Sequence, residues 1–172
     1  MAQLNFHINI PVLHRESSSA MSNGTLRFIP ICPSDSISIG TLNIMNARAA
    51  GTKTLSIGLY SLTGSTLSIA NSWSATISGS LVQNYVSLTA TSATQNITPG
   101  NWWLGMLIST SGTSNFSLVG QTIINPANAF PGGFVQGIMT DSTNALPSSY
   151  ATSNLDITGN DAFMVPYIIL TA

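Results

Sequence analysis

The chain has 172 residues, about the length of one domain, and 44% of them are hydrophobic, which is enough for a core without disulfide or metal support. Only four Lys or Arg and five Asp or Glu are present, so 5% of the residues are charged, against about 25% in ordinary soluble domains. The net charge of −1 without a basic run argues against direct nucleic-acid binding, and no apolar run approaches the roughly 20 residues of a membrane helix.

Residues 1–23 are predicted to be an N-terminal arm or an edge strand. Apolar and polar residues alternate through the first half of this segment, and a serine-rich stretch follows. The arm would pair with a neighbouring subunit or cap a sheet edge, while a strand of the same domain explains the pattern equally well. Its candidate contact residues are Leu4, Phe6, Ile8 and Ile10. The segment has no basic and apolar regions of a signal peptide, so we expect no secretory leader.

Residues 24–172 are predicted to form one all-β domain, an antiparallel β-sandwich or jelly roll. Apolar and hydroxyl residues alternate along residues 36–44, 54–62 and 65–69, as in half-buried strands. Gly- and Pro-containing turns separate many short strands, which is typical of sandwiches and barrels. Helix signals are weak, and a short helical turn at residues 44–50 is the one exception considered. The other expected strands are residues 25–31, 73–77, 82–89, 102–109, 116–119, 134–139 and 165–171.

Aromatic residues provide the best candidates for an interaction site. Adjacent strand residues point to opposite faces, so one ring of the Trp102-Trp103 pair should enter the core and the other should face outward. An outward indole would anchor a subunit interface or stack on a sugar ring. Residues 120–162 form a loop-rich insertion, the kind of segment that carries binding surfaces. The candidate interface or ligand residues are Trp102, Trp103, Tyr85, Phe130, Phe134 and Tyr150.

No catalytic or metal-binding pattern stands out. His7 and His14 are seven residues apart, which places them on opposite faces of a strand, and no Cys, His or Asp cluster accompanies them. A calcium site or a glycosidase carboxylate pair built from Asp141, Asp156 and Asp161 is a weaker interpretation than polar turns. The single cysteine excludes an intrachain disulfide. We therefore expect no enzyme activity, no cofactor and no metal.

Several segments together resemble a jelly-roll or β-sandwich module common in virion proteins of tailed bacteriophages. The similarity spans roughly residues 24–172, and the order of the motifs carries it more than any one motif. In chain order the motifs are Thr25-Leu26-Arg27-Phe28-Ile29-Pro30-Ile31, Ile57-Gly58-Leu59-Tyr60-Ser61, Ile97-Thr98-Pro99-Gly100-Asn101-Trp102-Trp103-Leu104-Gly105, Ala145-Leu146-Pro147-Ser148-Ser149-Tyr150 and Pro166-Tyr167-Ile168-Ile169-Leu170.

The resemblance implies a structural protein of the virion, assembled in the host cytoplasm, without shared catalytic residues. Proteins of this type decorate capsids or form parts of tails and fibres, often as trimers. The compact chain favours a capsid decoration, or cement, protein, with the major capsid protein and further copies of itself, as a homotrimer, as partners. The alternative is a tail or fibre module that recognises host surface glycans. Neither alternative predicts contact with nucleic acid or membrane.

Overall fold

The computed structural model describes residues 16–21, 24, 26–31, 33, 35–49, 51–77, 81–90, 95–110, 116–123, 145–155, 163–166 and 168–171. Strands dominate these residues, and every strand pair is antiparallel, so the predicted all-β sandwich is confirmed. The jelly-roll arrangement of the strands stays a prediction. An 11-stranded sheet folds into two layers, and a separate two-stranded sheet joins β3 (Ile37–Ile39) to β8 (Gln95–Ile97).

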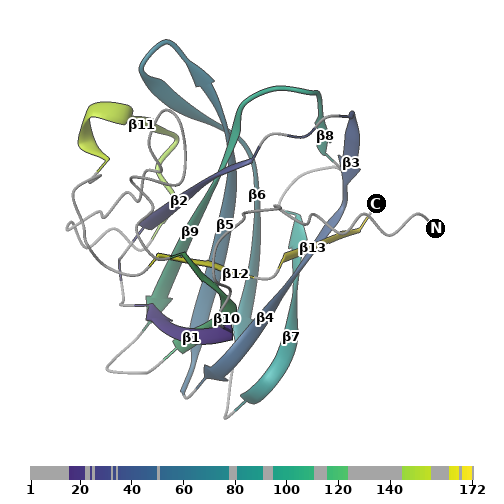
Figure 1. Cartoon of the computed structure of the whole chain (residues 1–172), viewed down its shortest axis with the longest axis vertical. Coiled ribbons are helices and arrows are strands. Elements are labelled where there is room, and N and C mark those ends of the chain that lie inside the picture. The colour runs from purple at the N-terminus through teal and green to yellow at the C-terminus, as the bar shows by residue number, and fades with distance from the viewer. Residues whose placement is uncertain are drawn as a thin grey trace.

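The first layer runs in the order β6, β5, β9, β2, and its centre is a long hairpin (Figure 1). Gly64, with a φ of 60°, makes the turn between the two hairpin strands, where a side chain would be strained. The short strand β11 pairs with β6 on the side away from β5. The bounds are β2 (Leu26–Ile31), β5 (Lys53–Thr63), β6 (Thr66–Ile77), β9 (Trp102–Thr110) and β11 (Ser149–Ala151).

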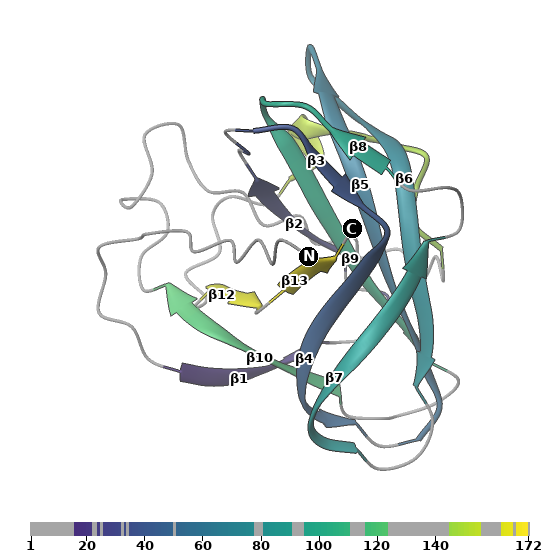
Figure 2. The same ribbon diagram turned by 90° about the vertical axis from the view of Figure 1, so that its right-hand side faces the viewer.

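The second layer packs across the first, as Figure 2 shows for β4 and β7 against β5, β6 and β9. It runs in the order β7, β4, β10, β1, and the last two strands of the chain pair with β10 and β4. The layers are connected where β6 pairs with β7 at Trp73↔Ala90 and Ser74↔Thr89. The bounds are β1 (Glu16–Met21), β4 (Thr41–Ala49), β7 (Leu81–Ala90), β10 (Phe116–Ile123), β12 (Phe163–Pro166) and β13 (Ile168–Thr171).

The main core lies between the two layers and is built from alternate residues of each strand. Trp73 is its largest side chain and is 0% exposed, and its Nε1 donates a hydrogen bond of 3.1 Å to the Gly40 carbonyl. This bond ties β6 to the bend between β3 and β4, and it satisfies the one polar group of the indole. The core members are Ile29, Ile39, Leu42, Ile44, Leu55, Ile57, Leu59, Trp73, Ile77, Val86, Leu88, Ile97, Leu104, Met106 and Ile108.

Two expectations about local structure are wrong, and each has a physical reason. The helical turn considered for residues 44–50 is absent, because β4 continues as a strand to Ala49 between β7 and β10. Residues 36–44 are not one strand, because the chain bends at Gly40 and sends β3 and β4 to different sheets. The expected strand at residues 134–139 lies outside the described residues.

The N-terminal segment belongs in part to the same domain. Residues Glu16–Met21 form β1, which pairs antiparallel with β10 of the same chain, from Glu16↔Gln121 to Met21↔Phe116. Of the two interpretations left open for residues 1–23, the intrachain strand therefore applies to this part. The predicted arm contacts Leu4, Phe6, Ile8 and Ile10 lie outside the described residues.

Candidate functional site

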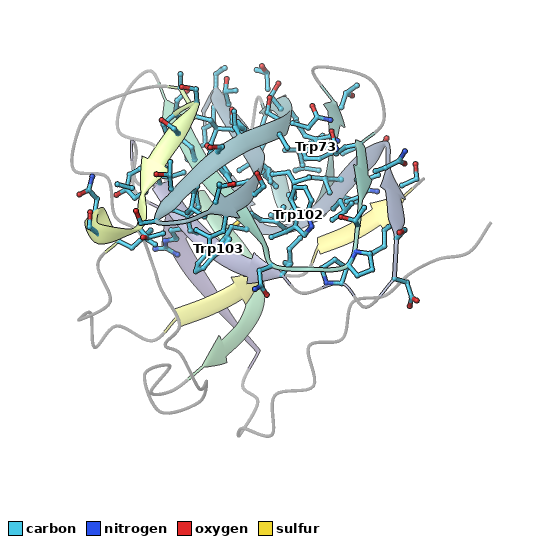
Figure 3. The ribbon with its side chains drawn as sticks, turned by 90° about the horizontal axis from the view of Figure 1, so that it is seen from above. Trp73, Trp102 and Trp103 are labelled. Carbon is cyan, nitrogen blue, oxygen red and sulfur yellow. The ribbon has the colours of Figure 1, made fainter. Side chains whose placement is uncertain are left out.

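The two adjacent tryptophans of β9 point to opposite faces of the first layer, as strand geometry predicts. Trp102 packs against the main core, and its Nε1 donates a hydrogen bond of 2.9 Å to the Thr98 carbonyl. Trp103 packs against a second apolar cluster on the outer face of the same layer. Both indoles are half-buried, and Figure 3 shows Trp102 between Trp73 and Trp103 in this view. Trp103 is therefore the tryptophan on the outer face of the sandwich.

The second cluster gives the first layer a buried face on each side. Phe28 and Tyr60 meet edge to face, with ring centroids 5.1 Å apart and an interplanar angle of 79°. The ring of Tyr150 also contacts Phe28, with ring centroids 5.1 Å apart and an interplanar angle of 41°. The buried members are Leu26, Phe28, Tyr60, Leu67, Leu107, Tyr150 and Leu155, and Ile69, Trp103 and Leu146 pack at its margin.

A pair of glycines makes room for this aromatic cluster. Gly58 of β5 and Gly105 of β9 lie directly opposite each other. A Cβ on Gly58 would come within 2.6 Å of Tyr60 Cε2, and one on Gly105 within 2.8 Å of the same atom and 2.9 Å of Phe28 Cε1. The two rings therefore lie directly on the backbone of the sheet, which only glycine permits.

A short segment of the loop-rich insertion, residues 145–155, covers the aromatic cluster at one end of the layer. Tyr60 donates its hydroxyl to the Pro147 carbonyl at 2.8 Å, and the Ile69 amide donates to the Ser148 carbonyl at 2.9 Å. The Thr152 amide, at the start of a 3-10 helix (Thr152–Asn154), donates to the Ser65 carbonyl at 2.9 Å. This latch segment (residues 145–155) is thus fixed to the β5–β6 hairpin by backbone and side-chain bonds.

Burial has a chemical consequence for both tyrosines of the cluster. It raises the pKa of Tyr60 and of Tyr150, because the phenolate is poorly solvated there. The Tyr150 hydroxyl donates to the Asn154 carbonyl at 3.0 Å. Tyr150, which was a candidate ligand or interface residue, is a buried member of the second cluster. A contact between Tyr150 and a partner stays a prediction.

Hydroxyl and amide side chains belong to most of the other exposed residues that the structure describes. On the first layer, Thr54 of β5 lies between Thr76 of β6 and Ser109 of β9, and Ser56 lies beside Ser74 in the next row of that face. On the second layer, Ser87 of β7 donates its hydroxyl to the side-chain oxygen of Asn43 of β4. These neutral rows are the outward halves of the alternating strand sequences.

Charge is almost absent from this surface. Among the residues whose exposure is described, Asp35 is the only charged one that is exposed, while Arg27 is half-buried and Lys53 is 1% exposed. Burial lowers the pKa of Lys53, because the ammonium loses hydration at the end of the main core.

The remaining predicted site residues are only partly placed. Tyr85 lies in β7 opposite Met45 of β4. Phe130, Phe134, His7, His14, Cys32 and the aspartates Asp141, Asp156 and Asp161 lie outside the described residues. Within the described part of the chain, no group of three His, Cys, Asp or Glu residues is placed to hold a metal ion. No helix in that part is long and apolar enough to cross a membrane.

Sequence reasoning did not identify Tyr60 or the glycine pair as parts of a site. A signal was present, since both β5 and β9 carry one glycine inside an otherwise apolar run. A glycine inside a strand marks close approach by another group.

Comparison of the chain with protein-family models, with curated proteins and with solved structures gave no match.

Proposed function

We propose that this chain is a structural virion protein of a tailed bacteriophage, and that it is a capsid decoration protein bridging capsid subunits. The observation that carries the proposal is the neutral outer surface of a sandwich with a complete core. Outside the second cluster, Ser, Thr and Asn side chains occupy most of the outward positions that the structure describes on both layers, where a free soluble domain normally carries Lys and Glu. The order of strand motifs that resembles phage virion modules supports the same function.

A neutral polar face suits a permanent interface for an energetic reason. Burying a charge requires a well-placed partner, while a hydroxyl or amide group needs only one hydrogen bond to be satisfied. A stable interface of ordinary size buries about 1,600 Å² in total. Rows of hydroxyls on two sheet faces supply donors and acceptors over such an area at low desolvation cost. Binding of this kind stabilises the closed shell by mass action.

The proposal is tested by adding the purified protein to shells that lack it and measuring co-sedimentation. We expect binding that changes less than about threefold between 50 mM and 500 mM salt, because screening acts on charges and this surface has almost none.

Two variants then identify the shell-facing layer. Ser74→Glu places a charge on the outer face of the first layer, and Ser87→Glu places one on the second layer. We expect one variant to lose binding at least tenfold and the other to bind normally, each serving as the control for the other. Undetectable binding of the unmodified protein, or equal binding by both variants and the unmodified protein, contradicts the proposal.

The second candidate function is recognition of host surface glycans by a tail or fibre module. The placement of Trp103 on the outer face favours it. On this account the protein would occur in few copies per particle, while a decoration protein covers the shell.

A further inference from the structure

The three tryptophans differ in what their indole N–H groups do. Trp73 and Trp102 donate to backbone carbonyls of the chain, those of Gly40 and Thr98. Within the part of the chain that the structure describes, Trp103 Nε1 has no acceptor, and it is not among the buried polar atoms that lack one, so this N–H is open to solvent. A half-buried tryptophan ring held by apolar neighbours, with its donor open to solvent, is arranged to contact something outside the chain.

The surroundings of Trp103 indicate the chemistry of that contact. Trp103 lies opposite Tyr60 in the register of β9 and β5. Two residues further along β5 on the same face is Leu62, which at 38% is an exposed large hydrophobic residue. Asn101, which is also exposed, comes directly before β9. An indole ring, its N–H donor and an exposed aliphatic neighbour therefore lie close together on this face.

Charge is missing from this area in the described structure. Lys53 lies at the opposite end of β5 and is buried. Arg27 pairs in register with the core residue Met106, so it lies on the inner face of β2. Recognition by the described residues of this area would therefore work through stacking and neutral hydrogen bonds.

We propose that Trp103 is the centre of a binding site for a neutral sugar ring. The C–H face of a pyranose would stack on the indole, and Nε1–H would donate to a sugar hydroxyl. Because no described residue at the site carries a positive charge, a sugar carboxylate would find no ion-pair partner there. We therefore expect the site to prefer neutral hexoses to uronic or sialic acids. This inference deepens the second candidate function and rests on it, since it names the class of sugar that the outer face would recognise, and it is independent of the decoration function.

The indole N–H signals of 15N-labelled protein test the proposal directly, since the chain has three tryptophans. The probes are neutral tetrasaccharides of glucose, galactose and mannose, and a tetrasaccharide of galacturonic acid, each titrated to millimolar concentration. We expect at least one neutral probe to shift the Trp103 signal in a saturable manner, with the Trp73 and Trp102 signals unchanged. The acidic probe should leave all of them in place.

Matched variants separate binding from folding. Trp103→Phe assigns the signal and keeps an aromatic ring against the second cluster, and Trp103→Ala should weaken sugar binding at least tenfold. Trp102→Phe is the control, since it alters the neighbouring residue on the core side and should leave sugar binding unchanged. Far-ultraviolet circular dichroism and urea unfolding establish that each variant is folded.

The proposal is overturned if no neutral tetrasaccharide shifts the Trp103 signal, or if the acidic probe binds as well as the neutral ones. A shift of the Trp103 signal only on addition of capsid shells also overturns it, and assigns the residue to a protein interface. The decoration function would survive each of these results, because it is measured by shell binding.

Discussion

Single residues in this sandwich are constrained most where aromatic rings touch the backbone. Gly58 and Gly105 lie under the rings of Tyr60 and Phe28, and both rings are fully buried in the second cluster. Small-to-large changes in a packed interior cost about 1–3 kcal/mol, since neighbours are forced from their preferred conformations. These two glycines are therefore structural requirements of the second cluster.

We expect Gly58→Ala and Gly105→Ala each to lower the free energy of unfolding by about 1–3 kcal/mol in urea titrations. Ser56→Ala, two residues from Gly58 on the same face, is the control and should change stability by less than about 0.5 kcal/mol. In the Tyr60→Leu background the cost of Gly58→Ala should shrink, because the atom that the new Cβ meets is gone. An unchanged cost in that background would show that the ring is not the cause.

Because Tyr60 is buried, it should make the free energy of unfolding depend on pH. Burial holds the pKa of Tyr60 above its ordinary value of 10.0, so the folded protein keeps the proton that the unfolded chain loses. The resulting stabilisation is complete below pH 10 and is lost as the pH rises from 10 toward the raised pKa. The protein should therefore unfold more readily at pH 11 than at pH 8.

Tyr60→Phe tests this expectation. At pH 8 we expect it to cost about 0.5–1.5 kcal/mol, since the bond to the Pro147 carbonyl is lost. Between pH 8 and pH 11 the variant should lose less stability than the unmodified protein. Tyr150→Phe should act in the same direction, because the pKa of Tyr150 is raised for the same reason. Equal losses in the unmodified protein and both variants would refute a role for buried phenols.

The strands themselves follow the sequence closely where alternation is regular. Residues 54–62 and 102–109 were predicted as strands and lie inside β5 and β9.

The two strands predicted at residues 65–69 and 73–77 are parts of one strand, β6, and the interruption of the pattern between them has a structural cause. The register of β5 and β6 shifts between Leu59↔Asn71 and Tyr60↔Ile69, leaving Ala70 as an extra residue. This β-bulge sends Ile69 to the second cluster and Trp73 to the main core, so the period of two continues with reversed faces.

The site was less predictable than the strands, because it depends on contacts between residues far apart in the sequence. Opposite faces for Trp102 and Trp103 follow from strand geometry alone. Which ring faces outward depends on the register with β5 and on the latch segment, residues 145–155, which bonds Tyr60 and the β5–β6 hairpin across 87 residues of sequence. Local patterns contain no information about contacts at that separation. Tyr150 shows the same limit, since this aromatic residue of a predicted loop-rich segment is buried against Phe28 of the distant strand β2.

In the part of the chain that the structure describes, a layer that is hydrophobic on both faces is combined with a mostly neutral polar exterior. Buried apolar residues lie on both sides of the first layer, in the main core and in the second cluster. Most exposed positions carry hydroxyl and amide groups, which create little long-range electrostatic repulsion between copies. Such a surface is suited to close packing beside identical neighbours, which the proposed decoration of a shell requires.

We propose that this chain covers a capsid, and the copy number of the chain in purified particles tests this proposal most directly. Quantitative mass spectrometry would measure the molar ratio of this chain to the major capsid protein. The decoration function predicts a ratio near one or a simple fraction such as one third, because symmetric oligomers occupy repeated sites on the shell. A few copies per particle would contradict it and place the chain in the tail, and complete absence would remove it from the virion.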